Sequence, residues 1–79
     1  MNEVSIYDKT KIDVGTNIMY QRERLGYSRP ALCKELDIKV NTLFKYEHGV
    51  INISALKCIE IAEALGVDVR EFFRSSLNE

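Results

Sequence analysis

The sequence predicts an all-α fold in which five short helices form one domain. Three times, a residue suited to cap a helix follows an apolar residue that can pack on another apolar residue five positions further along. The three capping residues are Ser28, Ser54 and Asp68. Glycines that can form the C-terminal turns follow three of the expected helices, at Gly26, Gly49 and Gly66. No strand pattern and no internal repeat interrupts this series, so a single helical domain is expected.

The first helix is expected over about residues 12–25. Val14, Ile18 and Leu25 fall on one helical stripe, and a glycine follows them. The residues before this helix have no helical period. The chain is therefore expected to divide into an N-terminal arm (1–11), a folded domain (12–76) and a C-terminal tail (77–79).

Two short helices joined by a three-residue turn are expected in the middle of the chain. The first begins after Ser28, and the second is expected over residues 40–48. Ile38, in the turn, is expected to point into the angle between them. Two helices held at a fixed angle leave the outer face of the second one free, and an exposed helix fits the major groove of DNA. The polar side chains of the second helix are therefore the first candidates for function.

The remaining two helices are expected in the C-terminal part of the chain. One spans residues 55–65, after the cap Ser54. Asp68 and Glu71 have the spacing of a capping box, in which each side chain accepts a hydrogen bond from the backbone of the other residue. They predict a helix from residue 69 to about 75.

The charges are unevenly distributed, although the net charge is only −1. Residues 20–50 hold six Lys/Arg and four Asp/Glu, whereas the remainder of the chain holds five and eight. The positive side of the molecule is therefore expected at the pair of central helices. This is where an anionic partner such as double-stranded DNA would bind.

Enzyme classes find no support in the sequence. There is one histidine, no glycine-rich phosphate loop and no metal-ligand spacing, so no catalytic residue, metal or cofactor is expected. Two cysteines lie 25 positions apart, which fits neither a disulfide framework nor a zinc site. They are expected to be reduced thiols in a cytoplasmic protein. No apolar run reaches the length of a membrane span, so no membrane partner is expected.

An ordered set of residues resembles the Cro/repressor-like (Xre-like) helix-turn-helix family over roughly residues 14–73. The matching positions are Gly15, Ile18, Arg22, Leu25, Gly26, Ser28, Leu32, Leu36, Ile38, Thr42, Leu43, Glu47, Gly49, Asn52 and the run 61–67. The resemblance implies a five-helix lambda-repressor-like domain that binds operator DNA, usually as a dimer. Asp37 stands where the family usually has glycine, and Asp tolerates the left-handed backbone that this turn requires.

The resemblance also implies which residues contact DNA. They are Arg29, Lys39, Val40, Asn41, Thr42, Lys45, His48 and Asn52. Their chemistry is suitable, because Asn can pair with adenine, Lys can reach guanine acceptors and Val can pack on a thymine methyl. Lys39 stands where a capping side chain is usual, which is either a tolerated defect or a sign that its ammonium meets a phosphate. Phe44 either packs against the N-terminal segment or lies near the DNA backbone.

Two further sets of residues follow from the resemblance. Arg22 and Glu47 stand where the family has a partly buried ion pair. Apolar candidates for a homodimer interface, which is expected to be weak, are Leu56, Val69, Phe72 and Phe73, with Val4, Ile6 and Tyr7 in reserve. The alternative is a helix-turn-helix module that binds another protein, such as an antitoxin or an accessory factor. The negative net charge and the unassigned apolar residues Leu56 and Ile59 favour this alternative.

Overall fold

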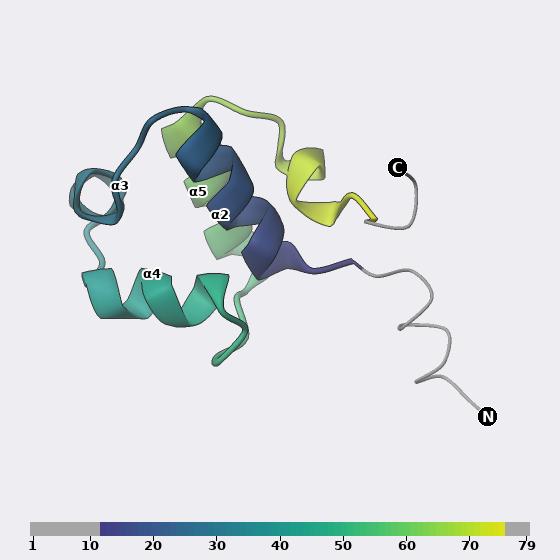
Figure 1. Ribbon diagram of the computed structural model, residues 1–79, viewed down its shortest axis with the longest axis horizontal. Helices are drawn as coiled ribbons and strands as arrows, with labels where there is room; N and C mark the ends of the chain where they lie inside the picture. Colours follow the sequence, from purple (N-terminus) through teal and green to yellow (C-terminus); the bar gives the residue numbers. More distant parts are fainter. Residues whose placement is uncertain (1–11, 76–79) are drawn as a thin grey trace.

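The computed structural model describes residues 12–75. Four α-helices and one 3₁₀-helix follow one another, namely α2 (Val14–Arg24), α3 (Arg29–Leu36), α4 (Val40–Glu47), α5 (Ala55–Leu65) and η1 (Val69–Phe73) (Figure 1). The predicted all-α fold is confirmed, but the fifth helix is a short 3₁₀-helix that ends before Arg74. In the part of the chain described here, the only extended pairing is an isolated antiparallel bridge between Ile12 and Ser75. The predicted arm, the tail, and residues Val4, Ile6 and Tyr7 lie outside the described residues.

Helix α2 begins two residues later than predicted. Asp13 is its N-cap, and the Asp13 carboxylate accepts a hydrogen bond of 3.1 Å from the backbone N–H of Thr16. Leu25 is the C-cap and is exposed, so it does not belong to the buried stripe with Ile18. The chain turns away at Gly26, which has φ +82°, and this turn carries Leu25 out of the helix.

Ser28 and Ser54 cap α3 and α5 as predicted, accepting hydrogen bonds from backbone N–H groups three residues further along. The predicted capping box is wrong. Asp68 accepts from the backbone N–H of Arg70, and the Glu71 carboxylate accepts from Arg74 at 3.2 Å instead of reaching back to Asp68.

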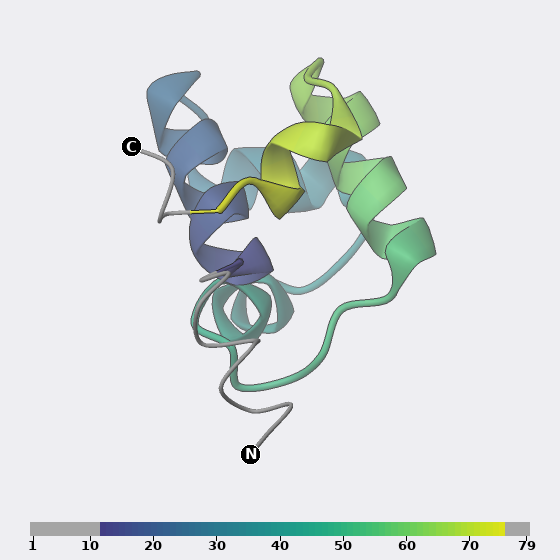
Figure 2. The same ribbon diagram turned by 90° about the vertical axis from the view of Figure 1, so that its right-hand side faces the viewer.

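The core lies between α2, α3, α4, α5 and η1, and each of these elements contributes at least one fully buried side chain. These side chains are Ile18, Leu32, Leu43, Ile61 and Phe72, with the thiols of Cys33 and Cys58 beside them. Turned by 90°, the molecule shows α4 end-on directly beneath α2 (Figure 2). Ile38 and Tyr27 pack against this core and are partly buried, as expected for the turn and for the residue before the cap.

The burial of Phe72 corrects the predicted dimer interface. Its side chain is 0% exposed, so it has no surface to offer a second chain. Val69 is partly buried against the core. Leu56 and Phe73 remain exposed.

Asn17 holds the segment that follows η1, because its side-chain amide donates to the carbonyls of Phe72 (2.8 Å) and Arg74 (3.0 Å).

Candidate nucleic-acid interface

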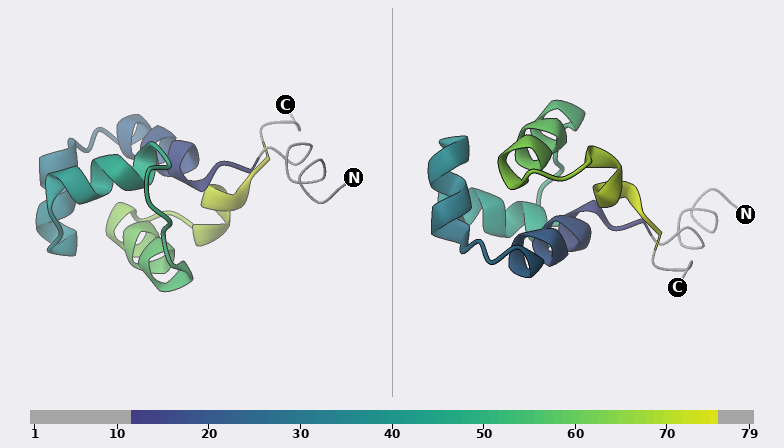
Figure 3. Two further views of the ribbon diagram at one scale, coloured as in Figure 1. Left: turned by 90° about the horizontal axis from the view of Figure 1, so that it is seen from below. Right: turned by 90° about the horizontal axis from the view of Figure 1, so that it is seen from above.

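Helix α4 lies at the edge of the molecule and exposes one long side. Its inner side carries Leu43 and Glu47, which are buried. Seen from below, α4 crosses the near side of the molecule with no other helix in front of it (Figure 3, left). Gly15 of α2 allows this close seat, because a Cβ at Gly15 would lie 2.8 Å from the carbonyl oxygen of Glu47 and would also clash with that of Tyr46. The backbone of α4 therefore rests directly on α2.

A buried carboxylate joins α4 to the two preceding helices. Glu47 is 2% exposed. Arg22 of α2 donates to both of its oxygens, from Nε to Oε2 at 2.7 Å and from Nη2 to Oε1 at 3.2 Å. Arg29, the first residue of α3, donates from Nε to Oε1 at 2.9 Å. The structure thus brings together the predicted pair Arg22 and Glu47, and adds Arg29 as a second cation.

Arg29, which the resemblance implies as a DNA contact, makes contacts within the protein. Its guanidinium bonds Glu47 and lies over the Phe44 ring, with Cζ 5.1 Å from the ring centroid. The Phe44 ring in turn lies 4.1 Å from the His48 ring, at an interplanar angle of 34°. Phe44 therefore packs against α3 and against the end of its own helix. Sequence reasoning missed this group, because Arg29 and Glu47 are 18 residues apart and no local spacing links them.

The other predicted contact residues lie on or beside the open side of α4. Asn41 and His48 are exposed, and Thr42 and Lys45 are half-buried. Lys39 and Val40 are exposed at the start of the helix, and the N-terminus of α4 has no side-chain cap, because the ammonium of Lys39 cannot accept a hydrogen bond. Asn52 is exposed in the loop between α4 and α5. In the turn before α4, Asp37 has the left-handed φ of 56° that the sequence predicts there.

The cations without a carboxylate partner among residues 12–75 are concentrated on the helix-turn-helix unit. Lys34, Lys39 and Lys45 all lack such a partner within 4 Å. By contrast, the three basic residues that follow α4 are each paired, as Lys57 with Glu60, Arg70 with Asp68 and Arg74 with Glu71. Two exposed carboxylates, Glu35 and Asp37, lie on the same unit, so its unpaired charge is positive by only a small excess.

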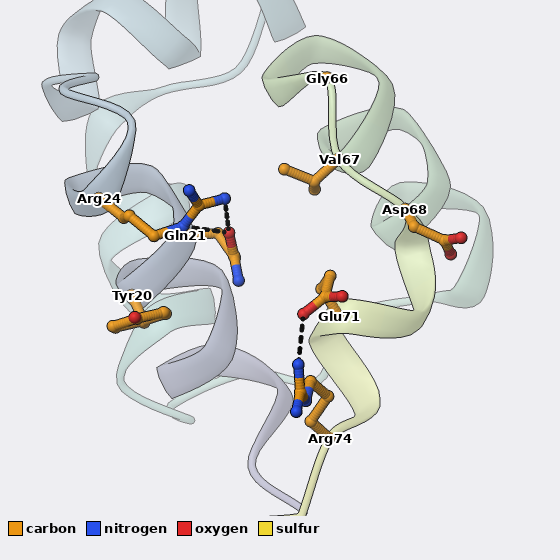
Figure 4. A pocket seen from close by; sticks show the side chains of 8 residues that line it. All are labelled: Tyr20, Gln21, Arg24, Gly66, Val67, Asp68, Glu71 and Arg74. Atoms are coloured by element: carbon orange, nitrogen blue, oxygen red, sulfur yellow. Dashed lines mark hydrogen bonds and ion pairs between the residues drawn. The ribbon is translucent and has the colours of Figure 1, made fainter.

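An open pocket of about 450 Å³ lies elsewhere, between α2 and η1 (Figure 4). None of its lining residues belongs to α3 or α4. Its charged side chains are engaged locally, with Arg24 on Gln21, Arg74 on Glu71, and Asp68 on Arg70. The hydrogen bonds from Arg70 lower the pKa of the Asp68 carboxyl to about 2. Within the described chain, Arg24 alone among these charged side chains lacks a partner of opposite charge, because Gln21 is neutral.

Residues 12–75 contain neither a metal-binding cluster nor a membrane-spanning helix. No group of three or more His, Cys, Asp or Glu residues is placed to hold a metal ion. No helix of the described chain is both long enough and apolar enough to cross a membrane.

Both cysteines are free and buried, and burial raises the pKa of the Cys58 thiol. Burial, and after it the charge of Glu47, raises the pKa of the Cys33 thiol.

Comparison with known families places the two central helices within a matching family. A family model described as helix-turn-helix matches residues 18–72, from the middle of α2 to the next-to-last residue of η1. The match covers well over half of the chain and contains both central helices. A comparison with curated proteins found no match.

Proposed function

The chain belongs to the Cro/C1-type (Xre-like) helix-turn-helix family of DNA-binding regulators, and from this premise we propose that it is a transcriptional repressor that places α4 in the major groove of an operator. The observation that carries the proposal is the open side of α4, where Asn41 and Lys45 stand one turn apart. An amide can pair with adenine and an ammonium with guanine acceptors. The proposal includes no catalytic step and no cofactor, and the protein acts in the cytoplasm.

The distribution of charge supports the same orientation on DNA. Affinity for a duplex comes largely from cations that neutralise phosphates. Lys34, Lys39 and Lys45 are free of carboxylates within the described chain and belong to the helix-turn-helix unit, whereas the basic residues after α4 are paired in place. DNA approaching the α4 side therefore meets unpaired positive charge.

We propose that two copies bind together. Reading a palindromic site needs two copies of α4 about one DNA turn apart, which symmetric pairing provides. Leu56 is 65% exposed and Ile59 is 43% exposed, one turn apart on α5. These residues are suited to the contact between the copies. The same two residues would also suit an interface with a different protein, which is the second candidate function.

Selection from random duplexes with the purified chain tests the proposal. We expect one enriched motif with two related halves, and an affinity that falls as salt concentration rises, by nearly one logarithmic unit per tenfold salt for each phosphate neutralised. A protein-interaction module should show neither result. Absence of salt-dependent duplex binding would therefore favour the second candidate function over the first.

A further inference from the structure

Helix α4 presents two parallel rows of side chains on its open side. Asn41 and Lys45 form a polar row. Val40 and Phe44 form an apolar row next to it, and each row is spaced by four residues. Val40 is 43% exposed and Phe44 is 42% exposed. A duplex that meets the polar row therefore also meets Phe44.

Two neighbouring side chains hold the Phe44 ring in place, one from α3 and one from the end of α4. Arg29 lies over it, with Cζ 5.1 Å from the centroid, and His48 lies 4.1 Å away, one turn further along α4. Held between these two groups, the ring loses little further conformational freedom when it binds a ligand. Its exposed part is therefore a rigid apolar surface beside the polar row.

Arg29 is engaged within the protein, where it shares the carboxylate of Glu47 with Arg22. Nε of Arg29 is 2.9 Å from Oε1 of Glu47, and the Arg29 side chain is only 27% exposed. A guanidinium that is bonded to a buried carboxylate and stacked on a ring fixes the position of that ring. The geometry thus separates the role of Arg29 from that of Lys39, which has no such partner.

We propose that Phe44 contacts the 5-methyl group of a thymine in the operator, and that Arg29 is the positioning residue that holds its ring. The proposal rests on the proposed function and adds a base preference to it. In the major groove the thymine methyl is the apolar group that a side chain can meet, and all the other base features there are hydrogen-bond donors or acceptors. An aromatic surface on the reading helix therefore favours thymine over cytosine at one position in each half-site.

Replacement of thymine by deoxyuridine, one position at a time in the selected site, tests the contact because only the methyl group is lost. With the unaltered protein, we expect affinity to fall about fourfold at one thymine per half-site, the effect of one buried methyl group. Phe44→Ala should abolish the thymine preference at that position alone, and Phe44→Leu should retain part of it. Tyr20→Ala, which removes an exposed aromatic ring on α2, should leave the preference unchanged.

The outcomes separate the two proposals. If no duplex is bound, the proposed function fails. If a site is selected but Phe44→Ala has the same thymine-to-deoxyuridine profile as the unaltered protein, only the present inference is overturned. A selected site with no thymine in its half-sites would overturn it as well.

The test of Arg29 must distinguish positioning of the Phe44 ring from contact with a DNA phosphate. Arg29→Lys keeps a positive charge near Glu47 but loses the planar group over the ring. We expect this variant to weaken the thymine preference at the Phe44 position and to leave the salt dependence of binding unchanged. Arg29→Gln, checked for folding by its melting curve, removes the charge as well. In this variant, a salt slope reduced by about one unit with an intact thymine preference would make Arg29 a phosphate contact and overturn the assignment.

Discussion

Arg22 Nε and Glu47 Oε2 are 2.7 Å apart, and this bond connects α2 to the last residue of α4. A second bond of 3.2 Å from Arg22 makes the contact bidentate. Because Glu47 also accepts from Arg29, the end of the reading helix is fixed to both helices that precede it. This carboxylate therefore helps to fix the orientation of α4.

Loss of Arg22 should destabilise the fold. We expect Arg22→Ala to lower the free energy of unfolding by about 1–3 kcal/mol, because Glu47 stays buried with only one of its two cations. Glu23→Ala, at an exposed neighbouring position, should cost less than about 1 kcal/mol. Denaturant titration measures both values. A double-mutant cycle of Arg22 and Glu47 that shows no coupling would contradict the account.

Gly15 should not tolerate a methyl group, although alanine is the better helix former by about 1 kcal/mol. We expect Gly15→Ala to destabilise by about 1–3 kcal/mol, because the added Cβ would displace α4 from α2. Thr16→Ala, at the exposed next position, is the control for helix propensity. Thermal melts of the two variants give the comparison, and a Gly15→Ala protein more stable than the parent would refute the close packing.

Asn41 and Lys39 should differ in the kind of DNA binding they affect. Asn41→Ala should weaken binding to the best site by about 1–3 kcal/mol and should hardly change binding to random duplexes, since it removes a base contact but no charge. Lys39→Ala should weaken both alike and should reduce the salt slope by about one unit. Fluorescence anisotropy over a salt series measures both. If neither variant changes duplex binding, α4 is not the reading helix.

The exposed α5 residues should control self-association. Leu56→Glu should weaken the dimer at least about tenfold, because two copies of an apolar contact are lost and two charges are brought together. Leu25→Glu, at the exposed apolar C-cap of α2, should have no such effect. Sedimentation of the protein alone and on its operator measures the change. A parent protein that is monomeric in both states would exclude the dimer.

Both thiols should react slowly in the folded protein. Burial raises the pKa of Cys33 and of Cys58, so the reactive thiolate is scarcer at neutral pH than in an exposed cysteine. We expect slow alkylation by iodoacetamide at pH 7.5, which becomes rapid in denaturant and proceeds faster as pH is raised. Mass spectrometry of the modified protein follows each site. Rapid labelling of either cysteine under native conditions would contradict its burial.

Local signals explain why most of the fold could be predicted. Ser28 and Ser54 cap their helices through hydrogen bonds that span only three residues of the chain. The helix Ala55–Leu65 has the predicted bounds. The start of α2 was predictable from the same rule, since Asp13 is a good cap and the apolar stripe begins at Val14, although the expected range of residues 12–25 begins two residues earlier. The short final segment has too few residues for periodicity to distinguish a 3₁₀-helix from an α-helix.

The candidate site was less predictable, because its geometry depends on contacts distant in sequence. Family resemblance placed Arg22 opposite Glu47, but nothing local could show that Arg29 also bonds Glu47 and covers Phe44. Phe72 has the same apolar character whether it fills a core or an interface, and only the packing of η1 decides between them. The pattern of paired and unpaired lysines likewise emerges only after folding.

The contact of Gly15 with the α4 backbone has a consequence for how this protein can acquire new targets. Main-chain carbonyls, which every residue possesses, form the seat of α4 on α2. The outward-facing positions, such as Asn41 and Lys45, take no part in that seat. Their identities can therefore be exchanged by mutation, or transplanted together from a related protein, while the platform stays the same. Evolution of a new operator preference is in this way separated from the maintenance of the fold.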